Sequence, residues 1–357
     1  MIKIQVKNKL NKQEHNQLYS LLFNSYGIQR KNKSKIGDIK NCPKKTFVVA
    51  KFNKKIVGFL ILVKRRFYFF NKIIKSLGMS FMVVEPRYHR FQISKKLLHE
   101  MFIISEKYDV ILGFAKKIMD NYYIKYGFLG ISNFSKVCLK INDLNTNEYK
   151  KMKITKTKKK DLIDINKIYN YANTFSAGFF LRDRILWKYY FLCKKTFEFY
   201  TIFKSAEIIG YLIINKKNII EINCKKNKEA PTLYTLKKFL KNKKYEKIIF
   251  ETNLNSPFIN YLKKYNHSLS TRYAWNGGHI LKIINFKKFI NLIYREKKYS
   301  FLRKFFREKY LLNNQMNKPE NQIQFTKLLF GLNNQYNQLK KFKITNSKIN
   351  FSNLDHF

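Results

Sequence analysis

Residues 84–98 read Val84-Glu85-Pro86-Arg87-Tyr88-His89-Arg90-Phe91-Gln92-Ile93-Ser94-Lys95-Lys96-Leu97-Leu98. The mostly apolar residues 79–84 predict a β-strand, and Pro86, which has no amide hydrogen to donate, ends it. From Ile93 onward apolar side chains recur at helical spacing, so a helix follows the turn. The first amides of such a helix have no partner inside it and, helped by the helix dipole, can bind a pyrophosphate. The stretch therefore predicts either an anion-binding helix start or an ordinary strand-to-helix loop.

The flanking sequence predicts the remaining elements of an α/β module. Apolar side chains recur at helical spacing or in short β-branched runs, and polar turns separate these runs. The predicted elements are a helix at 13–26, a hairpin of strands at 46–51 and 56–63, a strand at 79–84, a helix at 93–104, a strand at 110–114 and a short helix at 120–125. From the hairpin onward their order is β-β-β-α-β-α, with a strand–helix–strand crossover at the centre.

The stretch at 84–98 resembles the coenzyme-A loop of the GNAT acetyltransferases, whose usual form is Val-x-Pro-x-Tyr-Arg-Gly-x-Gly-Ile-Gly followed by x-x-Leu. The matching residues are Val84, Pro86, Tyr88, Ile93 and Leu97. The sequence departs from the family at four positions: His89 replaces Arg or Gln, Arg90 and Gln92 replace Gly, and Ser94 replaces Gly or Ala. Glycines at such positions let the backbone approach the phosphates closely.

This resemblance implies acetyl-CoA as co-substrate. In the family, the backbone of the central strand separates from its neighbour and hydrogen-bonds the pantetheine arm like an added strand. The implied cofactor-binding residues are Met82, Val83, Val84, His89, Arg90, Gln92, Ile93, Ser94 and Asn121. Apolar side chains in a central strand belong to the core by default, so only the backbone of residues 82–84 is assigned to the cofactor.

Residues 120–128, which read Asp-Asn-Tyr-Tyr-Ile-Lys-Tyr-Gly-Phe, are similar to the family segment beside the acetyl group. The resemblance implies that Tyr123 is the general acid that protonates the departing coenzyme-A thiolate. A phenol with a pKa near ~10 suits a thiolate of similar basicity. The alternative is that Tyr123 is one more packed aromatic residue among 24 tyrosines.

A second segment from Met152 onward repeats the same plan. Helices are predicted near 161–172 and 182–192, and a hairpin is predicted through 197–214. Residues 208–214, Ile-Ile-Gly-Tyr-Leu-Ile-Ile, are similar to residues 56–61, Ile-Val-Gly-Phe-Leu-Ile. The segment therefore reads as a second, diverged copy of the first.

The whole arrangement resembles the Eis-like acetyltransferases, named for enhanced intracellular survival. Residues 176–184 followed by Trp187 resemble the opening of their second domain, residues 277–284 its closing strand, and residues 325–331 a fragment of their sterol-carrier-like third domain. The prediction is an α/β (α+β) fold with two tandem GNAT-like units, each a mixed, mostly antiparallel sheet flanked by helices. The predicted domains are a catalytic domain at 1–150, a diverged GNAT-like domain at 151–290 and a short helical extension at 291–357, a sterol-carrier-like remnant.

The family often ends with an aromatic residue whose terminal carboxylate serves as general base, and this chain ends in Asp355-His356-Phe357. The resemblance implies that role for the carboxylate of Phe357. The alternative is an unstructured terminus, which is common for terminal residues.

The composition is strongly basic, with 73 Lys and Arg against 22 Asp and Glu and a net charge of +51. Such a charge often indicates a nucleic-acid or anionic-membrane surface. Here the charge is spread evenly, mostly as Lys, together with abundant Asn, Ile, Tyr and Phe and few Gly and Pro, which is typical of an AT-rich genome. Nucleic acid is therefore an open but not the favoured partner.

Other features indicate a soluble cytoplasmic protein without a metal. The four cysteines, Cys42, Cys138, Cys193 and Cys224, form no C-x-x-C pair and have no His at zinc-ligand spacing. No apolar run is long enough to span a membrane, and the N-terminus lacks the apolar core of a signal peptide.

The predicted function is N-acetyl transfer from acetyl-CoA to a primary amine by direct attack, with an amino sugar, small amine or protein as acceptor. Two alternatives remain open at this stage. The first is an aminoacyl-tRNA-dependent transferase with the same tandem fold, which would need no coenzyme-A loop and would use the positive charge. The second is a non-catalytic GNAT scaffold that binds nucleic acid.

Overall fold

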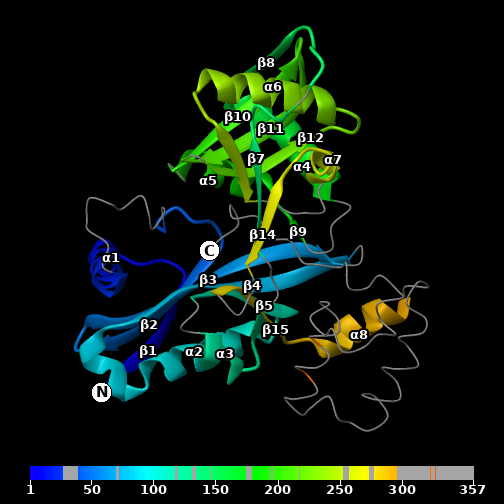
Figure 1. The fold of residues 1–357 in the computed structure, drawn as a ribbon. Coiled ribbons are helices and arrows are strands. Elements are labelled where there is room, and N and C mark those ends of the chain that lie inside the picture. The colour runs from blue at the N-terminus through cyan, green and yellow to red at the C-terminus, as the bar shows by residue number, and fades with distance from the viewer. Residues whose placement is uncertain are drawn as a thin grey trace. The chain divides into compact units, whose positions relative to one another are not determined.

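The computed structural model of the 357-residue chain describes residues 1–26, 39–69, 72–116, 120–130, 134–144, 146–173, 179–193, 196–216, 218–251, 257–272 and 277–295, together with Gln322 and Thr326. The described residues form two compact units (Figure 1). The first unit contains the residues up to 130 and from 277 to 295, and the second contains residues 134 to 272.

The first unit confirms the predicted order of elements. They are β1 (Lys3–Lys7), α1 (Lys12–Tyr26), β2 (Lys45–Phe52), β3 (Lys55–Phe69), β4 (Lys72–Val84), the 3₁₀ helix η2 (Pro86–Phe91), α2 (Ile93–Ser105), β5 (Val110–Lys116), α3 (Asp120–Ile124), β6 (Leu129–Gly130), β15 (Gly277–Ile283) and α8 (Phe286–Arg295). The strands follow the order β1-β2-β3-β4-β5-β15-β6. Only the β4–β5 pair is parallel among these neighbours.

Both faces of the first sheet are buried along β2 and the first part of β3. Successive side chains of a strand point to opposite faces, so Val48 and Leu60 pack with α2 on one face while Val49 and Phe59 pack with α1 on the other (Figure 1). This double burial explains why β2 and β3 are continuously apolar rather than alternating.

The second unit repeats this architecture. Its elements are β7 (Phe134–Lys140), β8 (Met152–Lys156), the 3₁₀ helix η4 (Lys159–Asp161), α4 (Leu162–Asn173), β9 (Phe179–Phe180), α5 (Arg184–Cys193), β10 (Phe197–Lys204), β11 (Glu207–Asn215), β12 (Asn218–Cys224), α6 (Glu229–Asn242), β13 (Lys247–Glu251), α7 (Pro257–Leu262) and β14 (Ser268–Arg272). Its strand order is β14-β7-β13-β12-β11-β10-β8, and β12 and β13 are parallel. The predicted mixed, mostly antiparallel architecture is thereby confirmed.

Two strands lie in sheets that their sequence position does not suggest. β7 pairs with β13 and β14 of the second unit, although it directly follows β6 of the first. β15 pairs with β5 and β6 of the first unit, although it directly follows β14 of the second. The compact units therefore differ from the predicted boundaries at 150 and 290, and residues 277–283 do not close the second unit's sheet. The sequence pattern predicts a strand but not which sheet will accept it.

The predicted extension at 291–357 lies mostly outside the described residues. Within it the structure describes the end of α8, Gln322 and Thr326. The sterol-carrier-like fragment at 325–331, apart from Thr326, and the terminal carboxylate of Phe357 are outside the described part of the chain. Among the helices that are described, none has both the length and the apolar character needed to cross a membrane.

Candidate functional site

The central strands of the first unit separate where the predicted site lies. β4 and β5 pair in parallel from Ser76 and Val110 to Met79 and Gly113, and their described pairing ends there. Just beyond, Phe81 adopts a left-handed backbone with φ 47°, and the β3–β4 register shifts at the same place. Such a bulge bends its strand and leaves part of its backbone outside the ladder. The bulge therefore opens a gap between β4 and β5.

A cavity of about 490 Å³ lies at this gap. Its lining residues come from α1, β4, the start of η2 and α2, β5 and α3: Ser25, Met79, Phe81, Met82, Val83, Val84, Pro86, His89, Ser94, Phe114, Ala115, Tyr122 and Tyr123. The volume lies within the range of about 300–1,000 Å³ typical of small-molecule sites. The cavity brings together six residues that the sequence assigns to the site: Met82, Val83, Val84, His89, Ser94 and Tyr123.

The turn between β4 and α2 is compact and leaves its cations exposed. Pro86 starts the 3₁₀ helix η2, and Gln92 joins η2 to α2 with a left-handed backbone, φ 52° and ψ 29°. Gln92 gives α2 no side-chain cap, so the first amides of α2 have no partner from that side chain. His89 is exposed, and its Nε2 lies 3.2 Å from the Val84 carbonyl oxygen. Arg87, Arg90, Lys95 and Lys96 are exposed around this junction.

The other predicted cofactor residues lie near the cavity without lining it. Ile93 is 1% exposed and packs in the core, so only its backbone faces the turn. Arg90 and Gln92 are exposed and are not among the lining residues. Asn121 lies in α3, and its side chain is outside what the structure describes.

Tyr123 lies at the α3 side of the cavity in a cluster of aromatic rings. It is 7% exposed and packs edge-to-face with Tyr122 and Phe128, at centroid distances of 5.4 Å and 5.8 Å. Its neighbour Tyr122 also lines the cavity. A hydrogen bond with Tyr122, together with burial, raises the pKa of Tyr126 to about 12. Tyr126, just after α3, therefore keeps its proton at neutral pH.

Sequence reasoning missed three aromatic lining residues: Phe81, Phe114 and Tyr122. Phe81 lines the cavity because of the bulge in β4, and the local sequence does not predict this bulge. Phe114 is 42% exposed and lies just beyond the last described β4–β5 pair, although strand alternation alone predicts only an ordinary core strand. Tyr122 could have been considered from its position beside Tyr123.

Metal ligands do not gather in the part of the chain that is described. No group of three or more His, Cys, Asp or Glu in that part could hold a metal ion. Burial, followed by the nearby charge of Glu229, raises the pKa of the Cys224 thiol to about 12, so this thiol is protonated at neutral pH.

Similarity to known proteins lies in the fold rather than in the sequence. No protein-family model and no curated protein matches the sequence. Among solved structures, a GCN5-related N-acetyltransferase from Anabaena variabilis is 14% identical, covers 80% of this chain and 74% of its own, and has a TM-score of 0.61. A GCN5-related N-acetyltransferase from Kribbella flavida is 10% identical over 80% of this chain and 72% of its own, with a TM-score of 0.60.

A third solved structure tests the predicted resemblance to Eis proteins. Eis1 from Mycobacterium abscessus is 10% identical, covers 81% of this chain and 76% of its own, and has a TM-score of 0.56. Identities this low are evidence for the fold alone, and the separation of β4 and β5 agrees with the central-strand separation that the resemblance implies. The chain therefore has the fold of the GCN5-related N-acetyltransferases, the GNAT fold, as the sequence predicts.

Proposed function

We propose that the chain is an N-acetyltransferase that transfers the acetyl group of acetyl-CoA to a primary amine. The observation that carries this proposal is the cavity at the separation of β4 and β5, with the start of α2 and the tyrosines of α3 both on its wall. The GNAT fold favours an acyltransferase activity, but a shared fold does not by itself establish that activity.

The two parts of the cavity wall suit the two parts of the co-substrate. The amides at the start of α2 and the exposed cations Arg87, Arg90, Lys95 and Lys96 suit the phosphates of coenzyme A. Within the described residues, the β5-facing edge of residues 82–84 has no strand partner, and it suits the amides of the pantetheine arm, which would add to β4 as a short strand.

The reaction needs no covalent enzyme intermediate. The amine attacks the thioester carbonyl, the C–S bond breaks, and the coenzyme-A thiolate leaves with a proton from Tyr123. Holding amine and thioester together contributes up to about 7–11 kcal/mol, and proton transfer a further ~10²–10⁴-fold. A base must accept the proton of the attacking amine. The soluble, cytoplasmic setting predicted from the sequence supplies acetyl-CoA.

Binding of the co-substrate is tested by thermal denaturation of the full chain with acetyl-CoA, with free coenzyme A and with ADP. We expect acetyl-CoA to raise the melting temperature. Ser94→Trp should abolish the rise because it fills the cavity, whereas His99→Trp, at an exposed position further along α2 that does not line the cavity, should keep it. No shift at millimolar acetyl-CoA would contradict the proposal.

The role of Tyr123 is tested by Tyr123→Phe, which removes only the hydroxyl. We expect kcat for amine acetylation to fall by about 10²–10⁴ with little change in the KM for acetyl-CoA. Tyr122→Phe, at the neighbouring lining position, is the matched control. A larger loss with Tyr122→Phe would assign the proton donor to Tyr122 instead.

A second candidate function is transfer of an amino acid from aminoacyl-tRNA. The exposed Arg90 and Gln92, where the family loop has glycine, together with the net charge of +51, favour it. Transfer of a radiolabelled amino acid from charged tRNA, with none from acetyl-CoA, would replace the first proposal by this one. If the chain only bound nucleic acid, without transfer from either donor, the non-catalytic scaffold would remain.

A further inference from the structure

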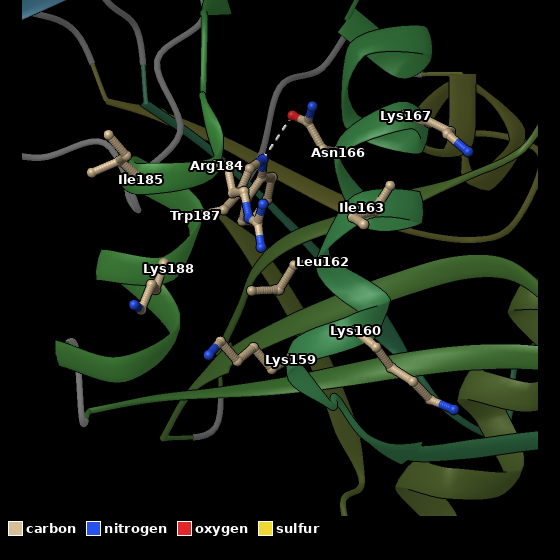
Figure 2. A pocket seen from close by; sticks show the side chains of 10 residues that line it. All are labelled: Lys159, Lys160, Leu162, Ile163, Asn166, Lys167, Arg184, Ile185, Trp187 and Lys188. Atoms are coloured by element: carbon tan, nitrogen blue, oxygen red, sulfur yellow. Dashed lines mark hydrogen bonds between the residues drawn. The ribbon is translucent and has the colours of Figure 1, made fainter.

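The second unit contains a larger pocket that the proposed reaction does not use. It has a volume of about 730 Å³ and lies between η4, α4 and α5 (Figure 2). Its lining residues are Lys159, Lys160, Leu162, Ile163, Asn166, Lys167, Arg184, Ile185, Trp187 and Lys188. All of them belong to the second unit, whereas the acetyl-CoA cavity belongs to the first.

The floor of this pocket is apolar and held rigidly. Trp187 is 1% exposed, and its Nε1 donates a hydrogen bond of 2.8 Å to Oδ1 of Asn166 on the facing helix (Figure 2). The indole also packs edge-to-face on Tyr169 and Tyr211. Because the ring is fixed from several sides, its surface is preformed. A ligand that binds there would therefore lose little free energy to ordering the side chain.

Apolar side chains also extend to the rim of the pocket. Ile163 is 61% exposed and Ile185 is 59% exposed, which is unusual for large aliphatic residues and places them on opposite helices of the rim. Exposed apolar groups around a concave apolar floor are typical of a binding site rather than of a plain surface.

The charged lining residues carry only positive charge. They are Lys159, Lys160, Lys167, Arg184 and Lys188, and Lys167 alone among them has an ion pair, with Asp164 at 3.1 Å, within the described residues. Two acidic residues that neighbour the lining residues in sequence accept backbone amides. Asp161 accepts the Lys158 amide, and Asp183 accepts the Leu186 amide at the start of α5. Within the described residues, the other four cations therefore face the solvent around the apolar floor without an ion-pair partner.

We propose that this pocket binds an anionic amphiphile, a molecule with a phosphate or carboxylate head and an apolar tail. The head lies among Lys159, Arg184 and Lys188, and the tail lies on Leu162 and Trp187. Arg184 offers a planar, two-pronged donor for such a head, while the lysines add point charges. The apolar floor and the cationic rim both contribute to binding. A neutral alcohol or inorganic phosphate alone therefore binds more weakly than the anionic amphiphile.

Titration calorimetry of the full chain with n-octyl phosphate below its micelle concentration tests this proposal, with n-octanol and inorganic phosphate as controls. We expect saturable binding of octyl phosphate that exceeds both controls by about tenfold or more. The double variant Arg184→Gln/Lys188→Gln should lose about tenfold in affinity, and Ile185→Ser should weaken binding as well. All three positions are exposed, so the variants should fold normally.

Two matched variants localise the effect. Lys238→Gln/Lys241→Gln removes two exposed charges from α6 of the same unit and should leave binding unchanged. Ser94→Trp blocks the cavity of the first unit and should also leave it unchanged, which separates this site from the proposed acetyl-CoA site.

Three outcomes would overturn the proposal. They are equal affinity for octyl phosphate and inorganic phosphate, full affinity in the Arg184→Gln/Lys188→Gln protein, and binding to anionic lipid vesicles without binding to monomeric octyl phosphate. The last would make the α4–α5 face a membrane-contact surface instead of a pocket for a single molecule.

Discussion

At the scale of single residues, the most unusual group is the guanidinium of Arg182, which is fully buried. Both of its terminal nitrogens donate to the Glu221 carboxylate, at 2.7 Å each, and the Tyr211 hydroxyl donates to the same carboxylate at 2.6 Å. The guanidinium also lies over the Tyr169 ring, 4.0 Å from its centroid. Burial and then the charge of Glu221 raise the pKa of Tyr211 well above its ordinary value.

Breaking this pair should be far more costly than replacing it. We expect Glu221→Gln to destabilise the second unit by about 3–5 kcal/mol, because Arg182 keeps a buried charge without a counter-ion. The double variant Arg182→Met/Glu221→Leu should lose much less, since it removes both charges together. Urea unfolding of the three proteins measures the difference, and equal losses in the single and double variants would contradict it.

Glu14, at the start of α1, forms ion pairs with Lys7 of β1 and Lys51 of β2. Burial by itself would raise its pKa, but hydrogen bonds from Lys51 at 2.6 Å and Lys7 at 2.5 Å outweigh this and lower the pKa to about 2. The ionised carboxylate is therefore favoured by folding. Its contribution is fully present above the unfolded pKa near ~4.3 and is lost as the pH falls toward 2.

Glu14→Gln should accordingly lose stability at pH 7, by about 1.4 kcal/mol for each unit by which folding lowers the pKa. The difference in unfolding free energy between Glu14→Gln and the unsubstituted protein should become smaller as the pH falls below about 4.5. Urea unfolding midpoints of both proteins between pH 7 and pH 3 measure this difference. Glu106→Gln, which removes an exposed carboxylate, should show only a small gap throughout. A constant gap for Glu14→Gln across this range would argue against the ion cluster.

At the scale of elements, two glycines occupy equivalent places in the two units. Gly58 of β3 pairs with Val84 at the end of β4, and Gly210 of β11 pairs with Cys224 at the end of β12. A Cβ on Gly58 would lie 2.9 Å from Cγ2 of Ile93, and a Cβ on Gly210 would lie 2.9 Å from the Asn223 carbonyl oxygen. The similarity between residues 56–61 and 208–214 thus reflects the same steric requirement in both units, because neither glycine position has room for a Cβ atom.

Gly58→Val should act on the proposed cofactor site through the first turn of α2. We expect a loss of about 1–3 kcal/mol from overpacking, together with weaker acetyl-CoA binding because Ile93 must move. Gly210→Val should cost stability in the second unit and leave acetyl-CoA binding unchanged. Denaturation and acetyl-CoA titration of both variants test this, and unaltered binding in Gly58→Val would disconnect β3 from the site.

Most elements were predictable because their signals are local. The β2–β3 hairpin, α2 and β5 follow from short apolar runs, and the turn at Pro86 follows from a missing amide hydrogen. The bulge at Phe81 was not predictable, since it depends on how β3 and β4 align. The motif at 84–98 predicted the lining residues from the end of β4 and the start of α2. Phe114 lines the cavity because β4 and β5 separate, and the spacing of residues in the sequence does not predict this separation.

At the scale of the whole molecule, each sheet is completed by a strand that its own sequence segment does not supply. β15 lies between β5 and β6, and β7 lies between β13 and β14. Consecutive strands pair roughly two-thirds of the time, so the sequence favoured β7 beside β6 and β15 beside β14.

The two units should therefore differ in their ability to fold alone. A fragment of residues 134–272 begins and ends in paired strands, β7 and β14, and should unfold cooperatively. A fragment of residues 1–130 lacks β15 and should not, but joining residues 277–295 to it through a flexible linker should restore cooperative unfolding. Circular dichroism during urea titration decides this, and cooperative unfolding of residues 1–130 alone would contradict it.

The position of β15 also sets an order of events during synthesis. Its partner β5 emerges from the ribosome roughly 160 residues earlier. At about 5–20 residues per second, β5 waits some 8–30 seconds with an unpaired edge while the whole second unit is made. The second unit can finish folding first, and the newborn first unit is the part of the chain that a chaperone would need to shield.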